Sequence, residues 1–178
     1  MATYDILVLV DVNNRTAQMY AADQGIVQGG TQGSNELWVK VPAESQLRWR
    51  AEPLQSAASD GTGLKLYHTL ITQFHLWEAN LNSTPPQGDA RQYLVEWGCD
   101  NGSGEAPFYN TPETIYPDKP IDIKPQGIYR PYIQCTTALG RNENQSKRVA
   151  YTLTVDVYLG DVKQYSISWD PYVTVYRK

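Results

Sequence analysis

The stretch Val149-Ala150-Tyr151-Thr152-Leu153-Thr154-Val155-Asp156-Val157-Tyr158-Leu159 alternates over its whole length, and every second residue from Val149 onward is apolar or aromatic. Because successive side chains of a strand point to opposite faces, this period of two predicts a strand with one face in a hydrophobic core. Gly160-Asp161 then supplies a hairpin turn, since glycine tolerates a positive φ. Lys163 to Trp169 is predicted as the returning strand.

Shorter segments elsewhere in the chain show strand patterns of the same kind. They are Tyr4 to Val12, Glu36 to Val41, Gln46 to Ala51, Gln92 to Trp97 and Tyr172 to Tyr176. Leu64 to Trp77 is ambiguous, because its largest apolar residues fall near a helical stripe while its Tyr, Thr and Ile residues favour a strand. We favour a strand there, since the neighbouring segments are strands.

About nine strands at regular spacing, with no capped amphipathic helix, predict an all-β chain. The expected fold is a two-sheet antiparallel β-sandwich of the jelly-roll or immunoglobulin-like type. A chain of 178 residues fits one domain, so residues 1–178 are predicted to form a single sandwich.

The surface is predicted to carry little charge. Charged residues make up 19% of the chain and the net charge is −4, whereas a typical protein has about 25% charged residues. Such a chain lacks the basic face that nucleic acids and anionic membranes require, so neither is an expected partner. The longest apolar run, Ile6 to Val10, is too short to span a bilayer and follows no export signal. We therefore predict a cytoplasmic protein in which Cys99 and Cys135 are reduced thiols.

No motif predicts catalysis. The chain has no nucleophile elbow, P-loop or dinucleotide fingerprint. Its two histidines, His68 and His75, lie seven residues apart and would point to opposite faces of a strand, so they could not bind the same metal ion there. The chain is therefore predicted to be no enzyme and to hold no organic cofactor.

One loop has the residues of a calcium site. Asp100, Asn101 and Glu105 lie in the Gly-rich segment Asp100 to Glu105, and hard oxygen ligands in such a turn suit Ca²⁺. The same residue types are also ordinary turn formers, so a turn without a metal is the alternative interpretation.

Three aromatic residues near this loop are candidates for sugar binding. The rings of Trp97, Tyr109 and Tyr116 could stack on the apolar face of a sugar, while neighbouring amides bind its hydroxyls. This would make the chain a lectin with glycans as partners, assisted by calcium where the Asp100 to Glu105 loop binds the ion. The other interpretation places these rings at a sandwich edge or a subunit contact.

Four segments resemble one protein family in order along the chain. They are Asp5 to Val12, Tyr20 to Val27, Leu47 to Arg50, and the closing stretch Tyr165 to Val175, which contains Trp169-Asp170-Pro171 and ends Thr174-Val175. Together they are similar to the AidA/PixA family of inclusion body proteins, and the similarity runs from the first predicted strand to the last.

This resemblance implies a small bacterial cytoplasmic β-sandwich, produced late in growth or under cell-density control, that accumulates in some members as crystalline inclusions. The family supplies no catalytic residues to carry over. The composition points the same way, because a tyrosine-rich surface with few charges resists contact between copies only weakly. We therefore expect a homo-oligomer that packs into ordered inclusions.

Overall fold

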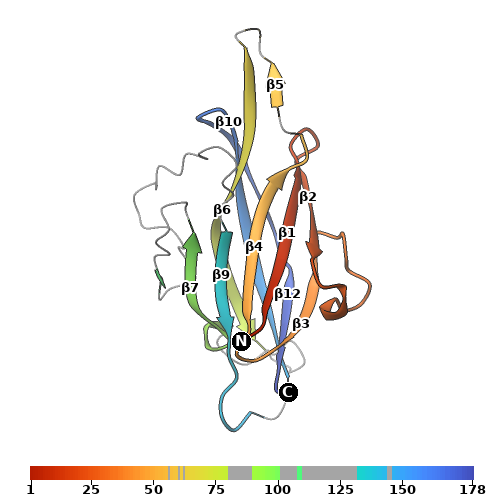
Figure 1. The fold of residues 1–178 in the computed structure, drawn as a ribbon, viewed down its shortest axis with the longest axis vertical. Helices are drawn as coiled ribbons and strands as arrows, with labels where there is room; N and C mark the ends of the chain where they lie inside the picture. Colours follow the sequence, from red (N-terminus) through yellow and green to blue (C-terminus); the bar gives the residue numbers. More distant parts are fainter. Residues whose placement is uncertain are drawn as a thin grey trace.

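Two facing β-sheets make up the structure, a computed structural model that describes residues 1–55, 57–59, 61, 63–79, 90–100, 108–109, 132–143 and 146–178 (Figure 1). The first sheet has the strand order β2 (Thr16–Ala21), β1 (Thr3–Asp11), β4 (Gln46–Pro53), β9 (Tyr132–Thr137), β7 (Leu94–Asp100), β8 (Phe108–Tyr109). The second has the order β3 (Trp38–Pro42), β12 (Tyr172–Tyr176), β10 (Lys147–Leu159), β6 (Leu64–Ala79), β5 (Ala57–Ser59), and β11 (Val162–Trp169) also pairs with β10. The described helices are two short 3₁₀ turns, Gln24–Ile26 and Ala90–Gln92.

The all-β prediction is confirmed, and the strand interpretation of Leu64 to Trp77 is confirmed by β6. The purely antiparallel arrangement is wrong at two places, because β1 pairs with β4 and β3 pairs with β12 in parallel. The count also differs, since the described residues form twelve strands rather than about nine. The strands that the sequence pattern missed include β2 and β9, whose buried faces hold small or polar residues such as Ala17, Cys135 and Thr137.

Strand β10 organises the second sheet, because it pairs with β6 along one edge and with both β11 and β12 along the other. The register on that second edge is the same on both sides of Asp170-Pro171, with Leu153 opposite Trp169 and Ala150 opposite Tyr172. Strands β11 and β12 therefore form one line that is interrupted where Pro171 lacks a backbone N–H. The Pro171 carbonyl still accepts from the Tyr151 N–H at 3.1 Å.

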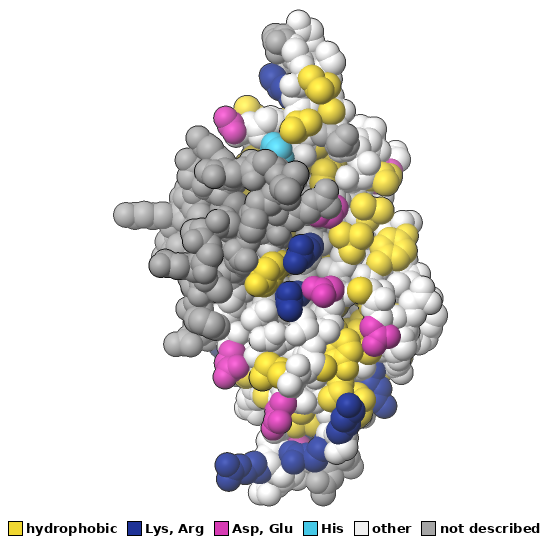
Figure 2. Space-filling view, viewed as in Figure 1, with side chains coloured by type: hydrophobic (Ala, Val, Ile, Leu, Met, Phe, Trp, Pro, Cys, Tyr) yellow, Lys and Arg dark blue, Asp and Glu magenta, His cyan; other side chains and the backbone are white. Residues whose placement is uncertain are grey.

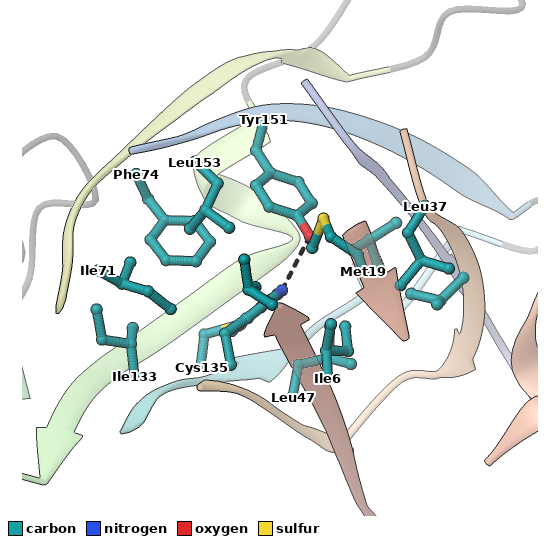
Figure 3. Packing of buried hydrophobic residues seen from close by; sticks show 14 of the residues in the cluster. Ile6, Met19, Leu37, Leu47, Ile71, Phe74, Ile133, Cys135, Tyr151 and Leu153 are labelled. Carbon is teal, nitrogen blue, oxygen red and sulfur yellow. Dashed lines mark hydrogen bonds between the residues drawn. The ribbon is translucent and has the colours of Figure 1, made fainter. Parts of the chain in front are cut away.

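Four aromatic rings join the two sheets at the centre of the core. Figure 3 labels two of them, Phe74 and Tyr151, and draws the hydrogen bond to the Tyr151 hydroxyl as a dashed line. Trp49 of the first sheet lies 5.9 Å from Trp97 of the same sheet, and 4.9 Å from Phe74 and 5.7 Å from Tyr151 of the second. The Trp49 indole N–H donates to the Tyr151 hydroxyl at 2.9 Å, and both side chains are fully buried. Burial raises the pKa of Tyr151 far above its usual value, so the hydroxyl stays neutral.

The connection between β2 and β3 covers one edge of each sheet. On β2, the Gln32 side chain donates to the Ala21 carbonyl at 2.9 Å and accepts from the Ala21 N–H at 3.0 Å, and Met19 exchanges backbone hydrogen bonds with Gly33 and Ser34. On β3, Val39 forms a bridge with Val27. The connection therefore occupies part of both edges and hinders pairing there with a strand from another chain.

The described ranges contain no helix with the length and apolar character that crossing a membrane requires.

Replacing Tyr151 by Phe should lower the free energy of unfolding by about 1–3 kcal/mol, because the buried Trp49 N–H then loses its acceptor. Urea unfolding followed by circular dichroism measures this change. The matched control is Tyr176→Phe, which removes a hydroxyl from a half-exposed ring and should leave stability unchanged. Equal stability of the two variants would contradict the assigned role of the buried hydrogen bond.

Replacing Gln32 by Ala should speed hydrogen exchange at the Ala21 amide, since its acceptor is removed. The Met19 amide, which donates to the Ser34 carbonyl at 2.9 Å, is an internal control and should keep its protection. Amide exchange measured by NMR reads both sites in one sample. Unchanged exchange at Ala21 would show that Gln32 does not protect this edge in solution.

Candidate functional site

Trp97, predicted to stack on a sugar, lies in the core. Its side chain is 1% exposed, its ring stacks on Trp49, and its indole N–H donates to the Leu94 carbonyl at 2.9 Å. A ring in this position offers no face to a sugar at the surface, so that prediction is wrong for Trp97. A backbone irregularity explains the error, because the register of β7 shifts between Val95 and Gly98 and Glu96 has a positive φ of 52°.

The other predicted ligand residues are only partly within the described structure. Asp100 ends β7 and Tyr109 belongs to β8, where its backbone pairs with Trp97, but their side chains lie outside the described residues. Asn101, Glu105 and Tyr116 lie outside them altogether. The calcium loop and the sugar-stacking role of the two tyrosines therefore remain predictions.

The part of the chain that the structure describes contains no group of three His, Cys, Asp or Glu residues that could hold a metal ion. Cys135 is a free thiol that is fully buried, and burial raises its pKa well above the ordinary value. A thiol held in its neutral form is a poor nucleophile, so Cys135 serves as a small core residue. His68 is half-buried in β6, and desolvation lowers its pKa against the opposing effect of Asp161.

The outer face of the second sheet carries a cluster of aromatic and cationic side chains. The Arg148 guanidinium lies over two rings, 4.1 Å from the centre of Trp38 and 4.3 Å from that of Tyr172. The Lys40 ammonium lies 5.2 Å from the ring centre of Tyr176. We call these five residues the Arg148 cluster. They come from three neighbouring strands, since β12 lies between β10 and β3.

Strand register explains how the Arg148 cluster forms. Thr174 lies opposite Arg148 on β10 and opposite Lys40 on β3, so all three point to the outer face in one row. Tyr172 and Trp38 form the next row on the same face. The Trp38 indole N–H donates to the Thr174 hydroxyl at 2.8 Å, which fixes the ring that Arg148 contacts.

Charge is not neutralised within the Arg148 cluster. Among the described residues, neither Arg148 nor Lys40 forms an ion pair, and the Arg148 Nε is buried without a hydrogen-bond partner. The rings contact the cations through their negative faces. Half-exposed Trp, Tyr and Arg side chains are the types that dominate binding energy in protein interfaces. The cluster is therefore suited to a contact with another macromolecule.

A smaller group of the same kind lies on the outer face of the first sheet. The guanidinium groups of Arg48 and Arg50 both lie 5.3 Å from the ring centre of Tyr132. Figure 2 shows this face, on which basic, acidic and hydrophobic side chains are interspersed. Each outer face of the sandwich thus presents arginine against aromatic rings.

The sequence contained part of the signal for these surface groups. Leu37, Val39 and Val41 alternate toward the core, which places Trp38 and Lys40 on the opposite face. Arg148 was not predictable in the same way, because the polar run Gly140 to Arg148 has the character of a loop, whereas β10 begins at Lys147.

Comparison with known proteins shows what the chain is similar to in fold. No protein-family model matches the chain, and no curated protein matches it. In fold, the chain is similar to an inclusion body protein. That structure is the inclusion body protein PixA from Burkholderia cenocepacia J2315, with a TM-score of 0.56 over 98% of this chain and 95% of that one, at 10% sequence identity. At this identity the likeness is one of architecture across nearly the whole of both chains.

Replacing Arg148 by Gln should lower the free energy of unfolding by about 1 kcal/mol, because the cation–ring contacts with Trp38 and Tyr172 are lost. A double-mutant cycle with Trp38→Leu isolates the Arg148–Trp38 contact in urea unfolding. Arg141→Gln, an exposed arginine in the loop before β10, is the control and should change little. Strictly additive effects of Arg148→Gln and Trp38→Leu would mean that the two side chains do not interact.

Proposed function

We propose that this chain is a non-enzymatic bacterial protein that self-assembles into ordered inclusions in the cytoplasm. The observation that carries the proposal is the Arg148 cluster, a half-exposed set of rings and cations on the outer face of the second sheet, in which neither cation forms an ion pair with another described residue. The fold likeness to an inclusion body protein supports it. Since fold alone does not determine function, the surface chemistry is the stronger part of the case.

The charge balance of the chain favours contact between copies. A net charge of −4 over 178 residues gives weak long-range repulsion. Arginine stacked on an aromatic ring has already lost part of its conformational freedom, so bringing it into an interface costs less entropy. The connection between β2 and β3 covers the edges of these two strands. At those edges, copies would therefore contact each other through side chains and not through backbone pairing.

Self-assembly is tested on the purified chain and in producing cells. We expect sedimentation velocity over a concentration series to show growth from small species to large ones, and thin-section electron microscopy of cells late in growth to show ordered bodies. Trp38→Gln should raise the concentration needed for assembly about tenfold, because it removes an aromatic anchor from the Arg148 cluster.

The control for this experiment is Arg141→Gln, which changes one exposed side chain outside the Arg148 cluster. It should assemble like the unmodified chain. Dispersed protein at high abundance in cells, together with a monomer at every concentration in solution, would contradict the proposed function.

A further inference from the structure

The outer face of the second sheet has a positive end. Arg148 and Lys40 lie in one row across β10, β12 and β3, with Thr174 between them. Neither cation forms an ion pair with another described residue. The rings of Trp38 and Tyr172 form the next row, which we call the aromatic row. Positive charge and aromatic rings thus occupy successive rows of the same face.

The negative end of this face lies one row beyond the rings. Asp170 stands in the break between β11 and β12, two residues before Tyr172, and its carboxylate accepts from the Thr152 hydroxyl at 2.5 Å. Thr152 points away from the core, since its neighbours Tyr151 and Leu153 are buried. Asp170 is therefore an exposed anion on the same outer face as the Arg148 cluster.

Other charged side chains near the two ends are paired within the molecule. Lys147 lies 3.6 Å from Glu143, and Lys163 lies 2.6 Å from Asp156. Each of these pairs adds no net charge to its end. Asp170, in contrast, forms no ion pair with another described residue.

One copy of the chain cannot pair the two ends with each other. Arg148 and Thr152, which mark the cationic and anionic rows, lie four residues apart on β10, about 13 Å at roughly 3.3 Å per residue. An ion pair requires a separation of about 4 Å. Along the strands the face therefore presents a cationic row, the aromatic row and an anionic row. A partner matches it when it brings the same kinds of row in the reverse order.

A second copy supplies that reverse order. We infer that two copies pack through the outer faces of their second sheets, about a two-fold axis that runs between the faces, crosses the strands and passes over the aromatic row. Each aromatic row then meets that of the partner. Asp170 of each copy lies between Lys40 and Arg148 of the other. This contact rests on the proposed function, for which it names the first step.

The arrangement of the three rows is what commits the face to a second copy. Charge of one sign on this face would suit any partner of the opposite sign, whereas a face that carries both signs on either side of its rings is complementary to itself after a half-turn. Trp, Tyr and Arg at the centre of a contact supply most of its binding energy, and the flanking charges set its register. A contact of this kind is isologous, so it closes a dimer and leaves the other surfaces free for growth.

Two charge reversals test the contact. Lys40→Glu and Asp170→Lys change exposed residues, and each places like charges opposite each other across the two-fold axis. Each variant should dimerise at least about tenfold more weakly than the unmodified chain in sedimentation velocity at low salt. The matched controls are Arg141→Glu and Asp161→Lys, which make the same reversals at exposed loop positions outside the three rows and should dimerise normally.

An equimolar mixture of the two variants gives the decisive result. In a mixed dimer, Asp170 of the Lys40→Glu protein meets an intact Lys40 and Arg148, and the lysine introduced by Asp170→Lys meets the glutamate introduced by Lys40→Glu. The mixture should therefore associate about threefold or more tightly than either variant alone, which a damaged fold could not produce.

Three results would overturn the face-to-face contact while leaving self-assembly intact. They are normal dimerisation of either variant, equal weakening by the two controls, and a mixture that associates no more tightly than its components. An unmodified chain that stays monomeric at every concentration would overturn both this contact and the proposed function.

Discussion

The hydrogen bond between Trp49 and Tyr151 sets how the two sheets meet. A sandwich filled with leucine can slide, because apolar contacts have no direction. Here the indole N–H of Trp49 on β4 of the first sheet donates to the Tyr151 hydroxyl on β10 of the second sheet at 2.9 Å, and both side chains are buried away from water. A buried donor without a partner costs more than the bond gains, so this pair selects one relative position of the sheets. Phe74 and Trp97 then fit around Trp49 at ring distances of 4.9 and 5.9 Å.

The same position determines which surfaces remain for contact. With β10 fixed over the first sheet, its N-terminal half lies beside β12 and presents Arg148 to the rings of Trp38 and Tyr172. The connection that leads into β3 covers the edges of β2 and β3, so backbone pairing with another chain is hindered there. The described surfaces that remain are the sheet faces, the protruding hairpin of β5 and β6 (Figure 1), and the outer edge of β11, which pairs with β10 along its other edge.

The sequence pattern predicted local structure well and long-range pairing poorly. Alternation from Val149 to Leu159 identified β10 because its buried residues are large and regular. The parallel pairing of β1 with β4 could not be read from either strand, since both would alternate equally in an antiparallel sheet. Trp97 was misplaced for a different reason, because the irregularity between Val95 and Gly98 changes which side chains of β7 face the core. The residue with the positive φ there is Glu96, which is not a residue type that predicts such a conformation.

Assembly through side chains has a consequence for the state of the protein in an inclusion. If strands from different copies were to pair, the sheets would have to extend or exchange edges, and the product would be as persistent as cross-β material. Contacts made through side chains such as those of the Arg148 cluster would leave the backbone hydrogen bonds of each sandwich unchanged. Such contacts are individually weak and depend on concentration through mass action. An inclusion held by them would therefore contain folded copies that separate on dilution, and the cover over the edges of β2 and β3 favours this outcome because it hinders strand pairing at those two edges.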